Sequence, residues 1–447
     1  MFERVEQKYL NGVAIDFVDS TRRALVARWD DHDEWLNGRL DCGIDPYSKF
    51  TESHILPQTA AGTRDGRVFA GVNFASQEYL NLASHPAVHE AATRAMALYG
   101  VHSAGSAALA GNTRLSRELE ERLAAFLGYR DCTVFPTGWG AGYGVIKTLI
   151  TPKDHIIIDV LAHARLPEGT RNATPNVHAF PHLSNEGVAR RLGRIRREHP
   201  AAGILVVTET VFSMDGDTPD IAALSALCRE YEAVLLVDVA HDLGAIGPTG
   251  RGALEKQGMV GKPDLLMGSF SKTFASNGGF VACNNPSLKL ALRYNCGPLT
   301  FTNALPPVQC AIVLKCLDII DSDEGAERRE RLMNNILYMR AAMEGADFKL
   351  LGRPSPIIPA ILGDNALSRL MTRYALEAGG IVNLVEYPAV SRNTCRWRLQ
   401  VMALHEQRHI DRFVEIAIAA RAKAQSHVAE IQAAEIAAEE TRHAVAL

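Results

Sequence analysis

The stretch from residue 203 to residue 238, GILVVTETVFSMDGDTPDIAALSALCREYEAVLLVD, decides the fold. It begins with an apolar run over 203–208, continues with a helical pattern over 219–231 and ends with a second apolar run over 234–238. Each run is apolar on both faces, which is typical of a strand buried beneath helices. This strand–helix–strand unit predicts an α/β fold.

The same pattern recurs on both sides of this unit. Further apolar runs that predict strands cover 132–135, 155–159 and 264–268, and a helical pattern covers 184–198. Repeated alternation of this kind predicts a central, mostly parallel sheet with helices on both faces. Such sheets bind their ligands at the carboxyl ends of the strands, so the residues that follow these runs are the candidates for function.

The chain divides into four segments by pattern. We expect an N-terminal helical lead-in that ends in a loop over 1–70, a large domain over 71–305, and a smaller C-terminal α+β domain over 306–415 that begins at Pro306-Pro307. Residues 416–447 are rich in Ala and Glu and predict a helical tail.

Composition excludes several classes of protein. The 447 residues carry a formal net charge of -4, so a broad basic surface for nucleic acid is not expected. The eight cysteines include no C-x-x-C pair, which favours reduced thiols over a disulfide framework or a zinc site. No signal peptide is visible, and no apolar run approaches the ~20 residues of a transmembrane helix. We therefore expect a cytoplasmic protein without a transmembrane segment.

Two strand ends carry residues suited to acid–base and covalent chemistry. Asp238 ends one apolar run, and His241 follows it by three residues. Lys272 lies in GSFSKTF (268–274), just after another run, among small and apolar neighbours. Burial there would lower the pKa of its amine, as covalent catalysis by lysine requires. Taken alone, an Asp at a strand end is more often a helix cap.

Two further strand ends complete the pattern. The glycine-dense turn TGWGAGYG (137–144) follows a strand and begins a helix, and it includes Gly138 and Trp139. Backbone N–H groups at such a helix start can hold a phosphate. The turn does not fit G-x-G-x-x-G, so a Rossmann dinucleotide site is not expected. His163 follows the strand over 155–159.

These features together suit pyridoxal 5'-phosphate (PLP). This cofactor needs a lysine for covalent attachment, an acid at its pyridine nitrogen, a phosphate cup and a group against its ring. Lys272 follows Asp238 by one strand, so both can reach the same crevice.

At this point the sequence resembles a known family, the α-oxoamine synthases. These fold-type I PLP enzymes include 8-amino-7-oxononanoate synthase, 2-amino-3-ketobutyrate ligase, 5-aminolevulinate synthase and serine palmitoyltransferase. The resemblance covers about residues 45–414 and includes NFASQEYL (73–80), HSAGS (102–106), TETVFSMDG (208–216) and GRG (250–252), besides the motifs around Asp238 and Lys272. The segments around Trp139, His163 and Cys283 are especially similar to the autoinducer synthase branch.

The resemblance implies roles for the residues that match. Lys272 would form the covalent link to PLP and later move the Cα proton of the substrate. Asp238 would keep the pyridine nitrogen protonated, His241 would hydrogen-bond the phenolic oxygen, and His163 would stack on the ring.

It also implies the remaining contacts. Ser269 and the backbone of Gly138 and Trp139 would hold the phosphate, and Ser213 belongs to a cofactor-binding motif. Thr302 and Asn303 match a segment that reaches the phosphate of the neighbouring subunit. Arg396 matches the arginine that binds the amino-acid carboxylate, although Arg398 is close enough in register to do so instead.

Some positions depart from the family pattern. Gln77, which we include among the substrate-binding residues, stands where the family usually has Asn. Ala104, Ala107 and Val239 replace a common Gly, Arg and acidic residue. These positions lie where substrates are selected, so the substrates of a named member do not transfer directly.

The expected activity is a PLP-dependent acyl transfer by a homodimer with a shared active site. An amino acid and an acyl thioester, carried by CoA or an acyl carrier protein, would condense with decarboxylation to an α-amino ketone. A PLP aminotransferase and a non-catalytic partner subunit are the alternatives. HEQRH (405–409) also fits the zinc motif H-E-x-x-H, but the resemblance places it where a strand leads into the last helix, and we expect no metal.

Overall fold

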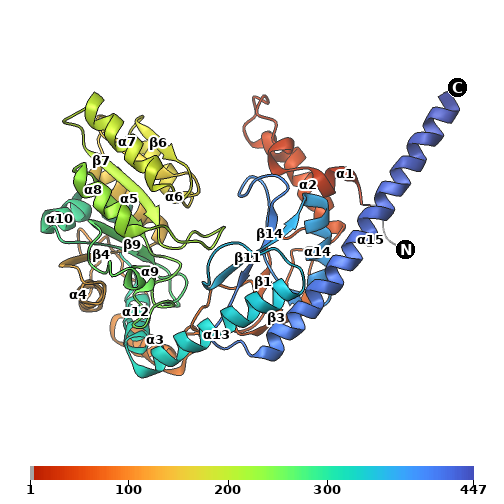
Figure 1. The fold of residues 1–447 in the computed structure, drawn as a ribbon. Coiled ribbons are helices and arrows are strands. Elements are labelled where there is room, and N and C mark those ends of the chain that lie inside the picture. Colours follow the sequence, from red (N-terminus) through yellow and green to blue (C-terminus); the bar gives the residue numbers. More distant parts are fainter. Residues whose placement is uncertain (1–4, 447) are drawn as a thin grey trace.

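The computed structural model describes residues 5–446, with the side chains of 435, 438, 439, 441, 442 and 444–446 excepted. Residues 1–4 of the expected lead-in and residue 447 of the expected tail lie outside the described part. Figure 1 shows two lobes joined at their base by the long helix α13 (Asp323–Gly345).

The larger lobe is built on a seven-stranded sheet in the order β4-β10-β9-β8-β7-β5-β6. Its strands are β4 (Asp131–Phe135), β5 (His155–Asp159), β6 (Val177–Phe180), β7 (Ile204–Glu209), β8 (Val234–Asp238), β9 (Leu265–Ser269) and β10 (Gly279–Cys283). Only β10 among them runs antiparallel to its neighbours, β4 and β9. The predicted mostly parallel sheet is confirmed.

Alternating residues of these strands enter two separate apolar cores, one on each face of the sheet. In β7, Val206 packs into one core and Leu205 and Val207 into the other. The helices around this sheet are α3 (Pro86–Tyr99), α4 (Arg114–Leu127), α5 (Gly138–Leu149), α6 (Arg165–Ala173), α7 (Asn185–Glu198), α8 (Ile221–Glu230), α9 (Gly252–Lys256), α10 (Pro286–Asn295), α11 (Gly297–Thr300) and α12 (Pro307–Ile320). Helices on both faces explain why the strands are apolar throughout.

Strands β6 and β10 were not expected from the sequence. β6 lies at the sheet edge, and only Phe180 of its four residues is buried, so it lacks the two-sided apolar pattern. β10 follows the Lys272 turn closely and returns antiparallel, a connection that the βα alternation does not predict.

The smaller lobe contains two further sheets. One has the order β11-β14-β13, with β11 (Ile357–Gly363), β13 (Leu384–Val385) and β14 (Cys395–Gln400). The other has the order β1-β2-β3-β12, with β1 (Phe50–Thr51), β2 (Gln58–Gly62), β3 (Val68–Asn73) and β12 (Gly380–Ile381). Its helices are α1 (Gln7–Asn11), α2 (Asp30–Asp41), α14 (Asn365–Glu377) and α15 (Gln407–Ala446), and short 3-10 helices cover Ala14–Phe17 and Val26–Trp29.

The stretch before residue 70 was expected to be a loop, but it contains β1, β2 and the start of β3. Their pairing depends on a distant segment, because β12 joins β3 in parallel through Gly380 and Val72. Gly71 makes this approach possible, since a Cβ there would lie 1.9 Å from the carbonyl oxygen of Gly379. A partner more than 300 residues away leaves no local pattern in the sequence.

The domain limits stay predictions, and two helices bear on them. α12 lies after the expected break at Pro306 yet packs against α3 of the larger lobe. α15 runs without a break across residue 416, where the tail was expected to begin. Within the described residues, no helix is long and apolar enough to cross a membrane.

Candidate active site

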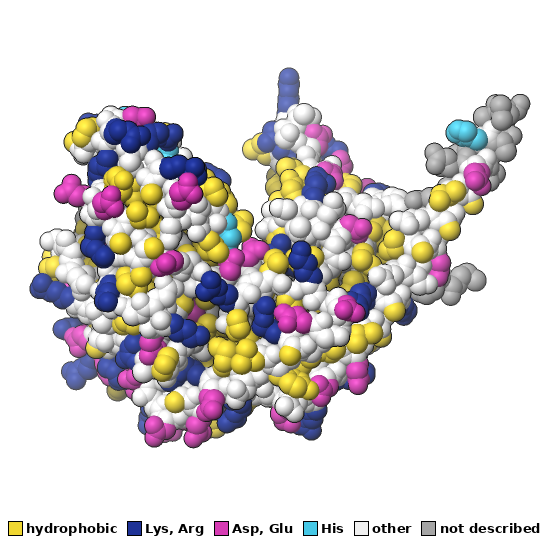
Figure 2. Space-filling model, viewed as in Figure 1, with side chains coloured by type: hydrophobic (Ala, Val, Ile, Leu, Met, Phe, Trp, Pro, Cys, Tyr) yellow, Lys and Arg dark blue, Asp and Glu magenta, His cyan; other side chains and the backbone are white. Residues whose placement is uncertain are grey.

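Figure 2 shows a hollow between the two lobes, and the loop that follows the carboxyl end of β7 meets the smaller lobe through Ser213 and Arg398. Three neighbouring strands end in polar residues, namely Glu209 on β7, Asp238 on β8 and Ser269 on β9. Glu209 and Asp238 are direct partners across the two strands. The parallel register therefore brings chemically active groups to one edge of the sheet.

Lys272 lies three residues beyond the end of β9 and is only 8% exposed. The pKa of its amine is lowered from 10.5 to about 8, chiefly by burial and next by the positive charge of Arg165, while Asp238 acts in the opposite direction. About a tenth of the amine is therefore uncharged at pH 7, far more than for an ordinary lysine. Such an amine can attack a carbonyl carbon.

Asp238 is 2% exposed, and its two oxygens have different partners. Oδ1 accepts a hydrogen bond from the backbone N–H of Ala240 at 3.0 Å. Oδ2 forms an ion pair with Nη2 of Arg165. The carboxylate is thus held in a fixed orientation at the end of β8.

The two histidines of the site are both uncharged at neutral pH. Burial lowers the pKa of His163 to about 4, and burial lowers the pKa of His241 well below its usual value. Nδ1 of His241 lies 3.2 Å from the hydroxyl of Tyr79. A neutral imidazole keeps one nitrogen free to accept a hydrogen bond and offers an uncharged face for stacking.

The position of His163 is set by two contacts. Its backbone N–H donates to Oε1 of Glu209, and its ring meets the half-exposed ring of Trp139 edge-on, with centroids 6.4 Å apart. Burial raises the pKa of Glu209 to about 8, with the nearby charge of Asp238 as the second cause. Both causes favour the protonated form of Glu209, because two adjacent buried negative charges are unfavourable.

The start of α5 lies directly against the end of β9. A Cβ on Gly138 would lie 2.6 Å from both Cβ and Oγ of Ser269, so only glycine lets the helix start approach Ser269 this closely. Oγ of Ser269 lies 2.7 Å from Oγ of Ser271. The start of a helix provides unpaired backbone N–H groups, and together with these hydroxyls it suits a phosphate.

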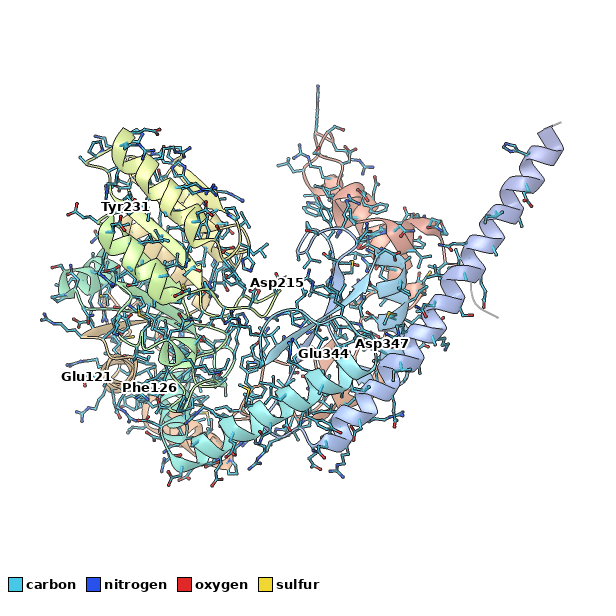
Figure 3. The ribbon with its side chains drawn as sticks, in the orientation of Figure 1. Glu121, Phe126, Asp215, Tyr231, Glu344 and Asp347 are labelled. Atoms are coloured by element: carbon cyan, nitrogen blue, oxygen red, sulfur yellow. The ribbon has the colours of Figure 1, made fainter. Side chains whose placement is uncertain are left out.

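Arg396 and Arg398 both lie on β14 and meet the loop that follows β7. Nη1 of Arg396 bonds Oδ1 of Asp215 at 2.8 Å, and Nε of Arg398 donates to the carbonyl oxygen of Ser213 at 2.5 Å. Figure 3 shows Asp215 between the two lobes. These contacts link the lobes across the hollow, and Arg396 is already paired with a carboxylate of this chain.

The remaining expected residues lie at the margins. Gln77 is half-buried in the segment after β3. Thr302 and Asn303 are exposed, and Nδ2 of Asn303 lies 3.3 Å from Nε2 of His102. Within this chain, the structure thus places Thr302 and Asn303 on the surface of the larger lobe.

Sequence reasoning did not single out four residues of this site, which are Tyr79, Arg165, Glu209 and Asp215. Three of them stood inside quoted motifs, and Arg165 follows His163 by two residues. Their contacts are tertiary, because Tyr79 meets His241, Arg165 meets Asp238, Glu209 meets His163 and Asp215 meets Arg396, so sequence position alone gave them no role.

The HEQRH segment is used in another way. His405 precedes α15, which begins at Gln407. Its Nε2 lies 3.0 Å from the carbonyl oxygen of Asn73, and its Nδ1 accepts the backbone N–H of Met402. Both ring nitrogens of His405 are therefore hydrogen-bonded to backbone groups of this chain.

The donor set at the hollow fits PLP. A buried amine with a lowered pKa, a fixed carboxylate, two neutral imidazoles and the helix start at Gly138 beside Ser269 supply the groups that this cofactor needs. These groups lie at or just after the carboxyl ends of four strands, so they share one side of the sheet.

Known proteins agree with this chemistry. The model of the aminotransferase class I and II family matches residues 70–416. The 8-amino-7-oxononanoate synthase of Geobacter sulfurreducens is 36% identical over 362 residues, which cover 80% of this chain and 91% of that protein. The Salmonella dublin protein of the same name is 35% identical over 346 residues, or 77% of this chain and 88% of its own length.

Solved structures give the same result. Sphingomonas wittichii serine palmitoyltransferase has a TM-score of 0.83 at 29% identity and covers 90% of this chain and 99% of its own. A structure of SPT with PLP has a TM-score of 0.83 at 31% identity and covers 90% of this chain and all of its own. The chain therefore belongs to the aminotransferase class I and II family and, within it, to the α-oxoamine synthases, PLP-dependent acyltransferases of fold type I that condense an amino acid with an acyl thioester and release the carboxylate as carbon dioxide.

Proposed function

We propose that Lys272 attaches PLP covalently and that Asp238, His241, His163 and the Gly138–Ser269 surface hold it. The observation that carries this proposal is the convergence of these groups at one sheet edge, with Lys272 buried and its pKa lowered to about 8. PLP supplies an electron sink that stabilises negative charge on the substrate's Cα. The protein's own part is to orient the cofactor and to move protons.

Each group has a defined task in this proposal. With PLP bound, the carboxylate of Asp238 would hold the pyridine nitrogen and favour its proton. His241, oriented by the Tyr79 hydroxyl, would hold the phenolic oxygen, and the neutral ring of His163 would support the cofactor ring. With PLP bound, Lys272 would also move the Cα proton of the substrate, because its uncharged amine can act as a base. Fixed groups of this kind need no rearrangement during reaction.

Two arginines compete for the amino-acid carboxylate. We assign it to Arg396, since its guanidinium already bonds a carboxylate, that of Asp215, whereas Nε of Arg398 is occupied by the backbone of Ser213. Gln77 is assigned to the substrate side of the same crevice. An incoming carboxylate would replace or share the place of Asp215 at Arg396.

The substrate class follows from the family and the names of its relatives. The two groups of relatives are named for 8-amino-7-oxononanoate formation and for transfer of palmitoyl to serine, so they differ in amino acid and acyl group. We propose a small amino acid and an acyl chain carried by CoA or an acyl carrier protein. The working compartment in this proposal is the cytoplasm.

Release of free thiol tests this function directly. Acyl-CoA substrates of several chain lengths are incubated with a panel of amino acids, and thiol, carbon dioxide and the amino ketone are measured together. The expected result is equal amounts of all three products, with none from Lys272→Ala. An aminotransferase would instead form an oxo acid without thiol, which would reject the acyl-transfer assignment.

The working unit in this proposal is a homodimer with a shared site. Large apolar side chains are exposed beside Asn303, with Val101 66%, Leu109 85% and Phe301 89% accessible. The bridge between Ser106 and Asn303 brings these segments together. In a dimer, Thr302 and Asn303 would reach the phosphate held by the partner protomer.

Subunit complementation tests the shared site. Lys272→Ala and Asn303→Ala chains are mixed, unfolded and refolded so that protomers exchange. If Asn303 serves the partner's site, half of the sites in each mixed dimer carry no substitution, and about a quarter of full activity returns. No recovery in a sample that sedimentation shows to be dimeric would contradict the shared site.

A further inference from the structure

Arg165 is a buried cation at the base of the proposed cofactor site. It begins α6, is 5% exposed and directs Nη2 at Oδ2 of Asp238. This oxygen belongs to the same carboxylate that the proposed function places against the pyridine nitrogen. The resemblance to known enzymes gave Arg165 no role.

The route of this side chain is built into the fold. Gly142 of α5 faces Arg165, and a Cβ there would lie 3.2 Å from Cδ and 3.3 Å from Nε of the arginine, with Sδ of Met267 at 3.0 Å. A larger residue at 142 would crowd this passage. The glycine-dense start of α5 therefore leaves room for the arginine stem as well as for a phosphate.

Arg165 is also incompletely satisfied. Its Nε is buried without a hydrogen-bond partner among the described residues. A buried guanidinium with one free N–H costs free energy that packing alone does not return. The ion pair with Asp238 offsets that cost only in part, which indicates a role beyond folding.

The charged and titratable groups around Lys272 come from six elements or turns. They are Arg165 on α6, Asp238 on β8, Glu209 on β7, Arg398 on β14, His163 before α6 and His241 after β8. Burial raises the pKa of Glu209 and lowers that of both histidines, which favours their neutral forms, and Asp238 forms a direct ion pair with Arg165. Arg165 is the second cause, after burial, of the lowered pKa of both Lys272 and His163.

We infer that Arg165 is a positioning residue that acts through Asp238. Its ion pair fixes the carboxylate and compensates part of the negative charge, so that Lys272 and the linkage it forms lose their proton more readily. The inference rests on the proposed attachment of PLP to Lys272. It adds Arg165 as a cation that lowers the pKa at Lys272, where PLP is attached in the proposed function.

A spectral titration of the holoenzyme tests the inference. The visible absorbance of the lysine-bound cofactor is followed against pH for wild type, Arg165→Gln and Arg165→Lys. Gln keeps a hydrogen-bond donor for Asp238 and removes the charge, while Lys keeps the charge. Removal of a nearby like charge favours the protonated form, so Arg165→Gln should raise the apparent pKa by about one unit, whereas Arg165→Lys should stay near wild type.

The outcomes separate this inference from the proposed function. Absence of the visible band from wild type loaded with PLP would reject Lys272 as the attachment point. A normal band with the same pKa in all three proteins would overturn the role of Arg165, and so would equal shifts in Gln and Lys variants, since packing rather than charge would explain them. If Arg165→Gln does not fold, Gly142→Ala supplies the second variant. The new Cβ at position 142 crowds the stem of Arg165 and should disturb its ion pair with Asp238. The apparent pKa of the lysine-bound cofactor in this variant should therefore also rise, and an unchanged value would again overturn the inference.

Discussion

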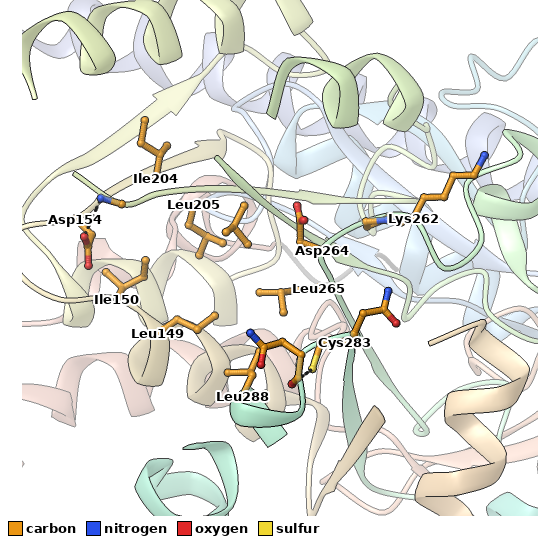
Figure 4. Close-up of a pocket in the computed structure, with 15 residues that line it drawn as sticks. Leu149, Ile150, Asp154, Ile204, Leu205, Lys262, Asp264, Leu265, Cys283 and Leu288 are labelled. Carbon is orange, nitrogen blue, oxygen red and sulfur yellow. Dashed lines mark hydrogen bonds between the residues drawn. The ribbon is translucent and has the colours of Figure 1, made fainter. Parts of the chain in front are cut away.

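The two ends of the parallel strands in the seven-stranded sheet differ in chemistry. The carboxyl ends form one side, called here the carboxyl edge, and the amino ends form the opposite side, called the amino edge. At the carboxyl edge, Glu209, Asp238 and Lys272 are buried and face one hollow. At the amino edge, a cavity of about 670 Å³ is lined mainly by apolar side chains, among them Leu149, Ile150, Leu205, Leu265 and Leu288 (Figure 4).

Charged residues also occur at the amino edge, but they serve the backbone. Oδ2 of Asp264 accepts the N–H of Leu235 at 2.8 Å, and Oδ1 of Asp154 accepts the N–H of Gly203 at 3.0 Å. Each carboxylate there completes a strand start. A buried acid at a strand end is therefore a functional candidate when other titratable side chains lie close to it, as they do around Asp238.

Among substitutions that test this difference between the two edges, Asp238→Asn should cause the largest loss of activity. The substitution keeps the size of the side chain but removes the charge that would favour a proton on the pyridine nitrogen. We expect kcat to fall about 10²–10³-fold, the cost of losing one fixed electrostatic group. Steady-state kinetics of fully loaded protein measure it, and a loss below about tenfold would contradict the role of Asp238.

The buried amine of Lys272 should make stability depend on pH in the cofactor-free protein. Its folded pKa is about 8 against 10.5 unfolded, so between these values the unfolded chain binds more protons and stability rises with pH. Relative to Lys272→Met, the wild-type chain should gain on the order of 3 kcal/mol from pH 8 to pH 10.5. Parallel curves in urea unfolding across this range would show that burial does not perturb the amine.

Arg396→Met should act on substrate binding. Loss of a charged hydrogen-bonding partner for the carboxylate should raise KM for the amino acid about 10–100-fold, with a smaller change in kcat. Arg398→Met is the matched comparison, because it lies on the same strand but bonds the backbone of Ser213. A larger increase of KM in Arg398→Met would mean that Arg398, not Arg396, binds the substrate carboxylate.

Asp264→Asn should have the smallest effect and is the counterpart of Asp238→Asn at the opposite edge. It weakens the hydrogen bond to Leu235, so the free energy of unfolding should fall by about 1 kcal/mol. Thermal unfolding measures this loss, and kcat should match wild type. A reduced kcat in a folded, PLP-loaded variant would mean that the two edges are not chemically separate.

Much of the larger lobe could be predicted from local patterns. The strands over 155–159 and 234–238 have the expected bounds, since a strand covered on both faces is a continuous apolar run with clear ends. The edge strand β6 and the β2–β3–β12 sheet escaped prediction, because one is half-exposed and the other depends on pairing across the whole chain.

The site divides in the same way. The candidates Asp238, Lys272, His163 and Gly138 follow predicted strands directly, so their common edge followed from the topology. Arg165, Glu209, Tyr79 and Asp215 were missed because each acts on a residue from another element. Such contacts exist only after the strands and the two lobes are packed.

The sequence by itself determined a parallel α/β sheet, its active edge and the groups that suit PLP, since periodicity and strand-end positions are local properties. The tertiary structure alone decided which of these groups are charged and what holds them. Burial beside Arg165 lowers the pKa of Lys272, and the pairing of Arg396 with Asp215 joins the lobes. Charge states and lobe contacts depend on distances between segments far apart in the chain, and only folding sets those distances.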